Sequence, residues 1–243
     1  MDKILEVKDI SISFAGIKAV QHLSFAVERG EIFGLIGPNG SGKSTTVNII
    51  AGNYIQDEGE VFFDGHPVNK RVSIAKRSRL GLGRTFQTPR PFGNLSVYDN
   101  VFSIFLQKYN FKDADIKTQE VLELSQLSPL KDMSASQLSI EKRKWLDLAR
   151  VLATESKFIM MDEVMAGLNP NEMKESIEFV RLINKQGITI LYIEHVMSAV
   201  VAVCTRVVVL NEGKLLFEGT PRNALENSSV IEAYIGRKKH AKN

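Results

Sequence analysis

A run of nine residues has the composition and spacing of a loop that binds phosphate. The run, called the phosphate loop below, fits G-x-x-x-x-G-K-[ST] and reads Gly37-Pro38-Asn39-Gly40-Ser41-Gly42-Lys43-Ser44-Thr45. Glycines let successive backbone N–H groups face an anion, Lys43 would reach the β- and γ-phosphates, and the Ser44 hydroxyl would ligate Mg²⁺. A chance glycine-rich turn would also match. However, an apolar run at 32–36 precedes the loop and a helical pattern follows it to residue 50, as a nucleoside triphosphate site requires.

Two acids follow a second apolar run. Residues 158–161 are wholly apolar, and Asp162 and Glu163 come directly after them. Asp162 is placed to hold Mg²⁺, often through water, and Glu163 to polarise a water that attacks the γ-phosphate. A strand-end glutamate standing alone would as readily be a solvated side chain. The phosphate loop and Asp162 together favour the catalytic interpretation of Glu163.

Composition limits the class of protein. The chain has 243 residues, of which 44% are hydrophobic and 24% charged, and its net charge is +3. These values are typical of a soluble globular protein, and the charge is too small to indicate nucleic-acid binding. A single cysteine, Cys204, excludes an internal disulfide. We expect no signal peptide and no membrane-spanning segment, so any membrane role would run through a partner.

The elements around these residues predict an α/β fold. Alternating apolar residues at 5–14 and 23–27, and a hairpin signal at Asp64-Gly65, predict an antiparallel sheet beside the nucleotide core. Asn169 followed by Pro170 predicts the start of a helix, and residues 188–193 predict another buried strand.

The middle of the chain has a different sequence pattern, with prolines and helical spacing. Pro89 and Pro91 break regular structure, Ser96 can cap a helix, and helical spacing recurs at 115–127 and 139–153. We therefore predict one domain over residues 1–243. It would have a P-loop NTPase (RecA-like) core with an antiparallel β subdomain, formed by residues 1–87 and 154–243. An α-helical subdomain of residues 88–153 would be inserted into this core.

The order of these motifs resembles that of ATP-binding cassette (ABC) ATPases over essentially the whole chain. The matching positions are Phe14, the phosphate loop, Gln87, Asp162-Glu163, residues 166–169 and His195. Within the family, the chain is most similar to the ATPase subunits of branched-chain amino acid importers. The stretches that carry this finer similarity are residues 83–87, 162–170, 193–195, 218–221 and 231–236. Lipopolysaccharide-export ATPases and urea or amide importers share much of this pattern.

The resemblance implies a role for each matching residue, with ATP and Mg²⁺ as cofactors. Phe14 would stack on adenine, although a lone Phe at a strand end more often belongs to a core. Gln87 would be a neutral ligand for Mg²⁺ and the attacking water. His195 would hydrogen-bond the γ-phosphate and help to orient that water. Asn169 and its neighbours would cross a dimer interface.

One stretch departs from the family pattern. The signature stretch, residues 137–145, keeps Leu138 and Ser139 but has Glu141 where the family normally has Gly. In these ATPases the signature, Ser139 included, closes over the γ-phosphate held by the opposite subunit. A like charge at ~4 Å costs about 1–4 kcal/mol at dielectrics of 80 to 20. The Glu141 side chain would face the phosphate, turn to solvent, or pair with Lys142, Arg143 or Lys144.

The resemblance also implies partners and a place in the cell. The chain would be a peripheral subunit at the cytoplasmic face of the membrane. It would pair with a second ABC ATPase subunit, as a homodimer or heterodimer, and would drive transmembrane permeases. It would not bind nucleic acid or insert into the membrane. Phe92 and Leu95 are candidate permease contacts, or else part of the subdomain core. The alternatives are a low-turnover nucleotide-binding regulator, a soluble ABC protein of DNA repair or translation, and a small P-loop kinase.

Overall fold

The structure is a computed structural model that describes residues 2–86 and 88–235. The chain forms two compact units. The first unit comprises Met1–Ser73 and Leu191–Asn243, and the second comprises Ile74–Ile190. The predicted helical subdomain, residues 88–153, falls within the second unit, and its boundaries stay a prediction.

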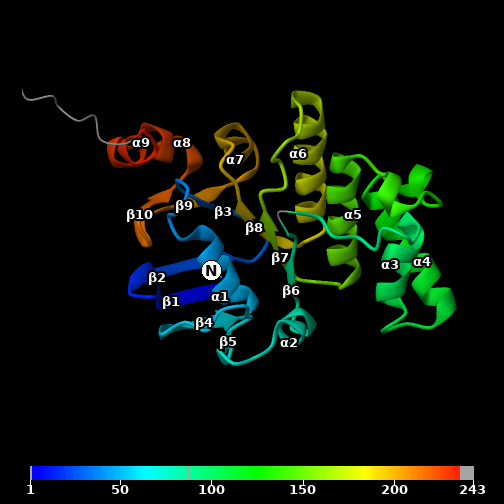
Figure 1. Ribbon diagram of the computed structural model, residues 1–243, viewed down its shortest axis with the longest axis horizontal. Coiled ribbons are helices and arrows are strands. Elements are labelled where there is room, and N and C mark those ends of the chain that lie inside the picture. Colours follow the sequence, from blue (N-terminus) through cyan, green and yellow to red (C-terminus); the bar gives the residue numbers. More distant parts are fainter. Residues whose placement is uncertain (1, 87, 236–243) are drawn as a thin grey trace, which may run out of the picture. The chain divides into compact units, whose positions relative to one another are not determined.

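An antiparallel sheet with the strand order β2-β1-β4-β5 forms one part of the first unit (Figure 1). Its strands are β1 (Lys3–Phe14), β2 (Ile17–Glu28), β4 (Glu58–Phe63) and β5 (His66–Pro67). The turn from β4 to β5 has Asp64 and Gly65 at φ of 52° and 77°. These left-handed values are typical of a tight two-residue hairpin. The antiparallel sheet predicted from the sequence is therefore confirmed.

A second sheet holds the strand that leads to the phosphate loop. In the first unit, β3 (Ile32–Ile36) pairs parallel with β9 (Arg206–Asn211), and β9 pairs antiparallel with β10 (Lys214–Gly219). Every residue of β3 is buried, which explains why its sequence is a continuous apolar run. The helices of this unit are α1 (Lys43–Ala51), α7 (Met197–Val203), α8 (Pro221–Glu226) and α9 (Ser228–Ile235). The strand β8 (Thr189–Ile193) begins in the second unit and ends in the first.

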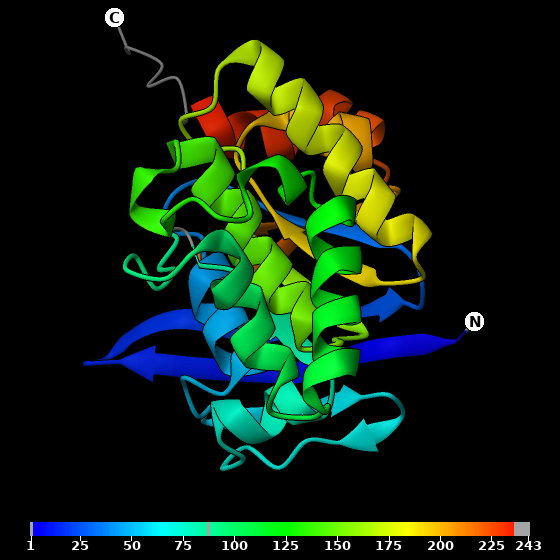
Figure 2. The same ribbon diagram turned by 90° about the vertical axis from the view of Figure 1, so that its right-hand side faces the viewer.

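The second unit combines a few parallel strands with helices. The strand β7 (Phe158–Asp162) pairs parallel with β6 (Leu82–Arg84) and lies between β6 and β8. The helices are α2 (Ile74–Arg79), α3 (Val97–Phe105), α4 (Phe111–Leu124), α5 (Ile140–Ala153) and α6 (Pro170–Lys185). Two short 3₁₀ turns lie at Ser128–Leu130 and Ala135–Gln137. Figure 2 shows the helices α3, α4 and α5, in green, running close to one another, and all three are in mutual contact.

Helix caps place several boundaries where the sequence predicts them. Ser96 accepts a hydrogen bond from Asp99 N and caps α3, while Asn169 and Glu172 form a capping box at the start of α6. The predicted start of one helix was wrong. The helix α4 begins at Phe111, not at residue 115, because Asn110 caps it. Among the residues that the structure describes, none of the helices is both long enough and apolar enough to cross a bilayer.

Candidate nucleotide-binding site

The phosphate loop joins β3 to α1 in the first unit. The Lys43 side chain is 6% exposed, and its Nζ donates to the carbonyl oxygens of Gly37 at 2.8 Å and Pro38 at 2.9 Å. These bonds hold the ammonium inside the curve of the loop. Ser44, the next residue, is exposed at the first turn of α1. The loop therefore has a buried cation and an available hydroxyl, which are the groups that bind phosphate and Mg²⁺.

Glycine is required at the first position of the loop. Gly37 has φ of 147°, and a Cβ there would overlap the Leu210 carbonyl oxygen and the Ser41 hydroxyl. Within residues 2–86 and 88–235, no side chain caps α1. The positive end of the dipole of α1 therefore lies at the phosphate loop, where it favours an anion. The residues of the phosphate loop fit a nucleoside triphosphate with its magnesium ion.

An exposed aromatic pair stands at the end of β1. Phe14 is 42% exposed, so it is not the core residue that a strand-end Phe more often is. Its ring meets that of Tyr54 edge to face, with 5.2 Å between the centroids. The sequence did not identify Tyr54, because nothing local links residues so far apart. The pair offers an aromatic surface on which a planar base could stack.

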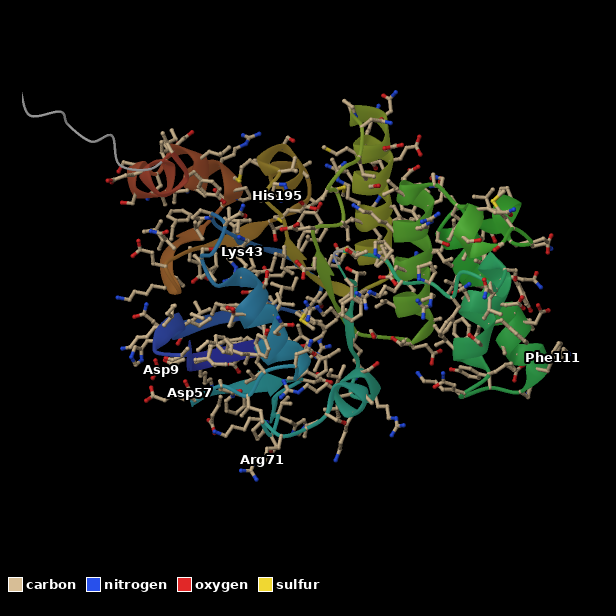
Figure 3. All side chains as sticks on the ribbon, viewed as in Figure 1. Asp9, Lys43, Asp57, Arg71, Phe111 and His195 are labelled. Carbon is tan, nitrogen blue, oxygen red and sulfur yellow. The ribbon has the colours of Figure 1, made fainter. Side chains whose placement is uncertain are left out.

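His195 follows the end of β8 and is exposed, while Glu194 beside it is completely buried. Figure 3 labels both Lys43, at the start of α1, and His195. Phe14, the phosphate loop and His195 thus all belong to the first unit.

The acids belong to the second unit. Asp162 ends the fully buried strand β7, where its carboxylate pairs with Arg84 at 3.1 Å and its N–H donates to the Thr85 hydroxyl at 3.2 Å. Glu163 follows at φ of 51°, a left-handed value that turns the chain away from the strand. Such backbone strain in a non-glycine residue is frequent at functional sites. The sequence did not predict the Arg84 contact, which fixes one carboxylate oxygen of Asp162.

The signature stretch starts α5, also in the second unit. The Ser139 hydroxyl accepts a hydrogen bond from Lys142 N at 3.2 Å and caps the helix. Glu141 is only 8% exposed, and its carboxylate lies 3.5 Å from Lys142 Nζ. Burial raises the pKa of Glu141, and Lys142 partly opposes that rise. Of the three orientations that the sequence allowed, the structure has the pairing with Lys142.

The same helix is tied to the segment after Glu163. Lys144 Nζ donates to the carbonyl oxygens of Val164 at 3.2 Å and Ala166 at 2.5 Å. Lys142 Nζ also lies 3.4 Å from the centroid of the Trp145 ring. Gln87, the remaining predicted site residue, lies outside the described residues. Among those residues, no cluster of three or more His, Cys, Asp or Glu side chains could hold a metal ion.

Comparison with known proteins places the chain in a family. The family model described as ABC transporter matches residues 20–166. The probable branched-chain amino acid transport ATP-binding protein LivG of Archaeoglobus fulgidus is 34% identical, with 96% of each chain aligned. The lipopolysaccharide export system ATP-binding protein LptB of Escherichia coli strain K12 is 30% identical over 96% of this chain and 97% of LptB.

A solved structure shows the same fold. The ADP conformation of MJ1267, an ATP-binding cassette of an ABC transporter, superimposes with a TM-score of 0.87 at 31% identity. The match covers 98% of this chain and all of that one. The fold, with its antiparallel β subdomain, mixed sheet and helical insert, is thus the ATP-binding cassette fold predicted from the sequence.

Proposed function

Because the chain belongs to the ABC transporter family and carries its ATPase domain, we propose that it is the ATP-hydrolysing subunit of a membrane importer for branched-chain or related small amino acids. The observation that carries the proposal is the phosphate loop, in which the buried Lys43 ammonium is held against the Gly37 and Pro38 carbonyls at the start of α1. The identity of 34% to LivG supports the choice of cargo.

Each predicted site residue has a role in this proposal. Phe14, next to Tyr54, stacks on adenine, and Lys43 contacts the β- and γ-phosphates. The magnesium ligands are Ser44, Gln87 and Asp162. Bound Mg²⁺ would neutralise charge on the phosphates.

Hydrolysis needs a base and a group that orients the water. Glu163 accepts a proton from the water whose oxygen bonds to the γ-phosphorus, while the bond from that phosphorus to the β–γ bridging oxygen breaks and ADP leaves. His195 donates a hydrogen bond to the γ-phosphate and helps to orient the water. The left-handed backbone of Glu163 and the Arg84 pair on Asp162 support this division of work between the two acids.

Two subunits would sandwich the nucleotides, with Ser139 of one facing the phosphate loop of the other. Glu141 makes these two composite sites unequal when the partner has an ordinary signature. The site formed by this chain's phosphate loop and the partner's signature would be active. The other site, which contains Glu141, would be weak, because the start of α5 holds a carboxylate close to where the γ-phosphate must lie.

The permease contact is proposed around residues 87–95 and the middle helices of the chain. Phe92 and Leu95 support this position because they are 55% and 38% exposed. Such a contact would hold the chain at the cytoplasmic face of the membrane. The name of the LptB relative makes lipopolysaccharide export the first alternative for the cargo. Co-purification of permeases from solubilised membranes, followed by uptake of labelled leucine into vesicles, would separate the two.

The central test replaces Lys43. We expect Lys43→Ala to lower affinity for Mg·ATP at least tenfold, because it removes a charged partner of the phosphates worth about 1.5–3 kcal/mol. Calorimetric titration of the purified chain measures this change, and a circular dichroism spectrum verifies folding. Unchanged affinity would refute the proposal. Nucleotide binding without turnover, even with the natural partners present, would favour the low-turnover regulator instead.

A further inference from the structure

Two residues at the end of β6 contact Asp162, and all three belong to the second unit. The strands β6 and β7 run parallel, and Arg84 is the register partner of Met160, two residues before Asp162. Arg84 Nη2 donates to Asp162 Oδ2 at 3.1 Å, and the Thr85 hydroxyl accepts from Asp162 N at 3.2 Å. Thr85 N donates in turn to the Met160 carbonyl oxygen at 2.9 Å. Both the side chain and the backbone of Asp162 are thus held by the end of β6.

The Arg84–Asp162 pair is largely shielded from water. The Arg84 side chain is 13% exposed and the Asp162 side chain is 10% exposed. Such a pair interacts more strongly than a surface pair, because solvent and salt screen its charges less. The Phe86 ring also lies near the guanidinium, with 5.4 Å from Arg84 Cζ to the ring centroid. These contacts hold one positive charge beside the acid that is proposed to bind Mg²⁺.

Residues 84–86 are also connected to α5. Phe86 N donates to the carboxylate of Asp147 at 3.4 Å, and that carboxylate lies 3.5 Å from Arg150 Nη1. Asp147 is only 6% exposed, so its position on the helix is fixed by packing as well as by these bonds. The 3.4 Å bond is long for an N–H donor, which makes it the weakest of the contacts along residues 84–86. A displacement of Arg84 would therefore act first on the Phe86 amide.

A carboxylate that pairs with a guanidinium binds a divalent cation less tightly, because the two cations repel each other. We propose that Arg84 is a positioning residue that orients the Asp162 carboxylate and, by competing for its charge, sets its affinity for Mg²⁺. The competition is reciprocal by linkage: metal bound at Asp162 weakens the Arg84 contact, and with it the bond from Phe86 N to α5. This inference rests on the proposed function, in which Asp162 is a magnesium ligand.

The test compares nucleotide affinity with and without the metal. The probe is β,γ-imido-ATP, an analogue that resists hydrolysis, titrated calorimetrically into the full chain in Mg²⁺ and in EDTA. The ratio of the two affinities isolates the contribution of the metal, because a lost positive charge acts on the nucleotide in both buffers. We expect this ratio to rise about tenfold in Arg84→Gln, which removes the charge that repels the metal. Arg84→Lys keeps that charge and should keep the wild-type ratio.

The matched control is Arg181→Gln on α6 of the same unit. It makes the same change in net charge at a side chain that is 43% exposed and pairs with Glu178. Its affinity ratio should equal that of the wild type, and unfolding temperatures verify that each variant folds. An unchanged or lower ratio in Arg84→Gln would overturn the inference, since the Arg84–Asp162 pair would then not compete with the metal.

Hydrogen exchange tests the reciprocal effect in the wild-type chain and needs no variant. With the analogue bound, Mg²⁺ should speed exchange of the Phe86 amide relative to EDTA, because it weakens the contacts of residues 84–86. Equal or slower exchange in Mg²⁺ would overturn the inference even if Arg84→Gln fails to fold. If the wild-type chain binds no nucleotide in either buffer, the proposed function fails and this inference fails with it. If the wild type binds and Arg84→Gln has its ratio, the proposed function stands alone.

Discussion

Glu141 departs from the family signature, and the fold around it stays intact. The residue occupies the first turn of α5, where an acidic side chain interacts favourably with the helix dipole. Its carboxylate lies beside Lys142, whose ammonium also rests on the Trp145 ring. The helix is therefore well formed, although burial of the Glu141 carboxylate raises its pKa and so carries a desolvation cost. In the proposed sandwich of two subunits, a further cost would fall on any phosphate that approaches the same turn from the facing subunit.

Replacing Glu141 tests this interpretation directly. In the isolated chain, which would pair only with itself, both composite sites contain Glu141, so we expect slow ATP hydrolysis. Glu141→Gly should raise the rate about tenfold, corresponding to roughly 1.4 kcal/mol of removed repulsion. Steady-state phosphate release measures the rate.

Glu141→Gln serves as the matched control, because it keeps the size of the side chain and removes its charge. An increase in both variants assigns the effect to charge, and an increase in Glu141→Gly alone assigns it to size. Fast, cooperative hydrolysis by the unaltered chain would show that Glu141 does not weaken the site.

In the second unit, a cluster of polar side chains around Glu155 links the helices α3, α4 and α5. Glu155 follows α5 and accepts a hydrogen bond from the Tyr109 hydroxyl at 2.7 Å. It also pairs with Lys117 of α4 at 3.0 Å and with Lys108, just after α3, at 3.3 Å. Burial raises the pKa of Glu155, but these bonds outweigh burial and lower it to about 2. One carboxylate thus connects the middle of α4 to the segments that follow α3 and α5.

This cluster predicts a pH dependence of stability. The pKa of Glu155 is lower in the folded than in the unfolded chain, so its contribution is complete above an unfolded pKa of about 4.5. That contribution is lost as the pH falls from about 4.5 toward about 2. Because the side chain is 34% exposed, solvent screening limits the contribution to about 1 kcal/mol. Urea unfolding of Glu155→Gln should show a loss of that size at pH 7 and a smaller loss near pH 3.

The exposed Glu120 of α4 provides the control for this experiment. Glu120→Gln should change the free energy of unfolding by less than about 0.5 kcal/mol at either pH. An equal loss in Glu155→Gln at pH 7 and pH 3 would contradict the assignment to charge.

The sequence predicts elements whose signals are local. Ser96, Asn169 and the Asp64-Gly65 turn each lie within a few residues of the groups that they bind, and the structure confirms all three. Asn110 is an N-cap residue of the same kind, so the start of α4 could also have been predicted from the sequence. Short α2 has no amphipathic pattern long enough to identify it.

Contacts between residues far apart in the sequence could not be predicted in the same way. The Arg84–Asp162 pair and the Phe14–Tyr54 ring contact join residues that only the folded chain brings together. No spacing rule in a single sequence connects such pairs. The phosphate loop could be predicted, because all of its functional groups lie in one continuous run of residues.

For the whole molecule, the proposed machinery is divided along the chain. The phosphate loop lies in the first unit, while Glu163 and the signature serine Ser139 lie in the second. In the proposed sandwich, the chain supplies both halves of a composite site, one to its own nucleotide and one to its partner's. A single altered residue in one half therefore affects only one of two sites when the partner is a different protein.

This division predicts an asymmetric response in the assembled transporter. With a partner ATPase that has an ordinary signature, Glu163→Gln in this chain should lower ATP hydrolysis by the complex at least a hundredfold, because a positioned base contributes about 10²–10⁴ in rate. Removing the corresponding glutamate of the partner should leave at least half of the activity, since that site faces Glu141. ATP binding to each complex, measured in parallel, verifies that assembly is intact. Equal losses from the two substitutions would show that both sites contribute, and Glu141 would then have no role in setting them apart.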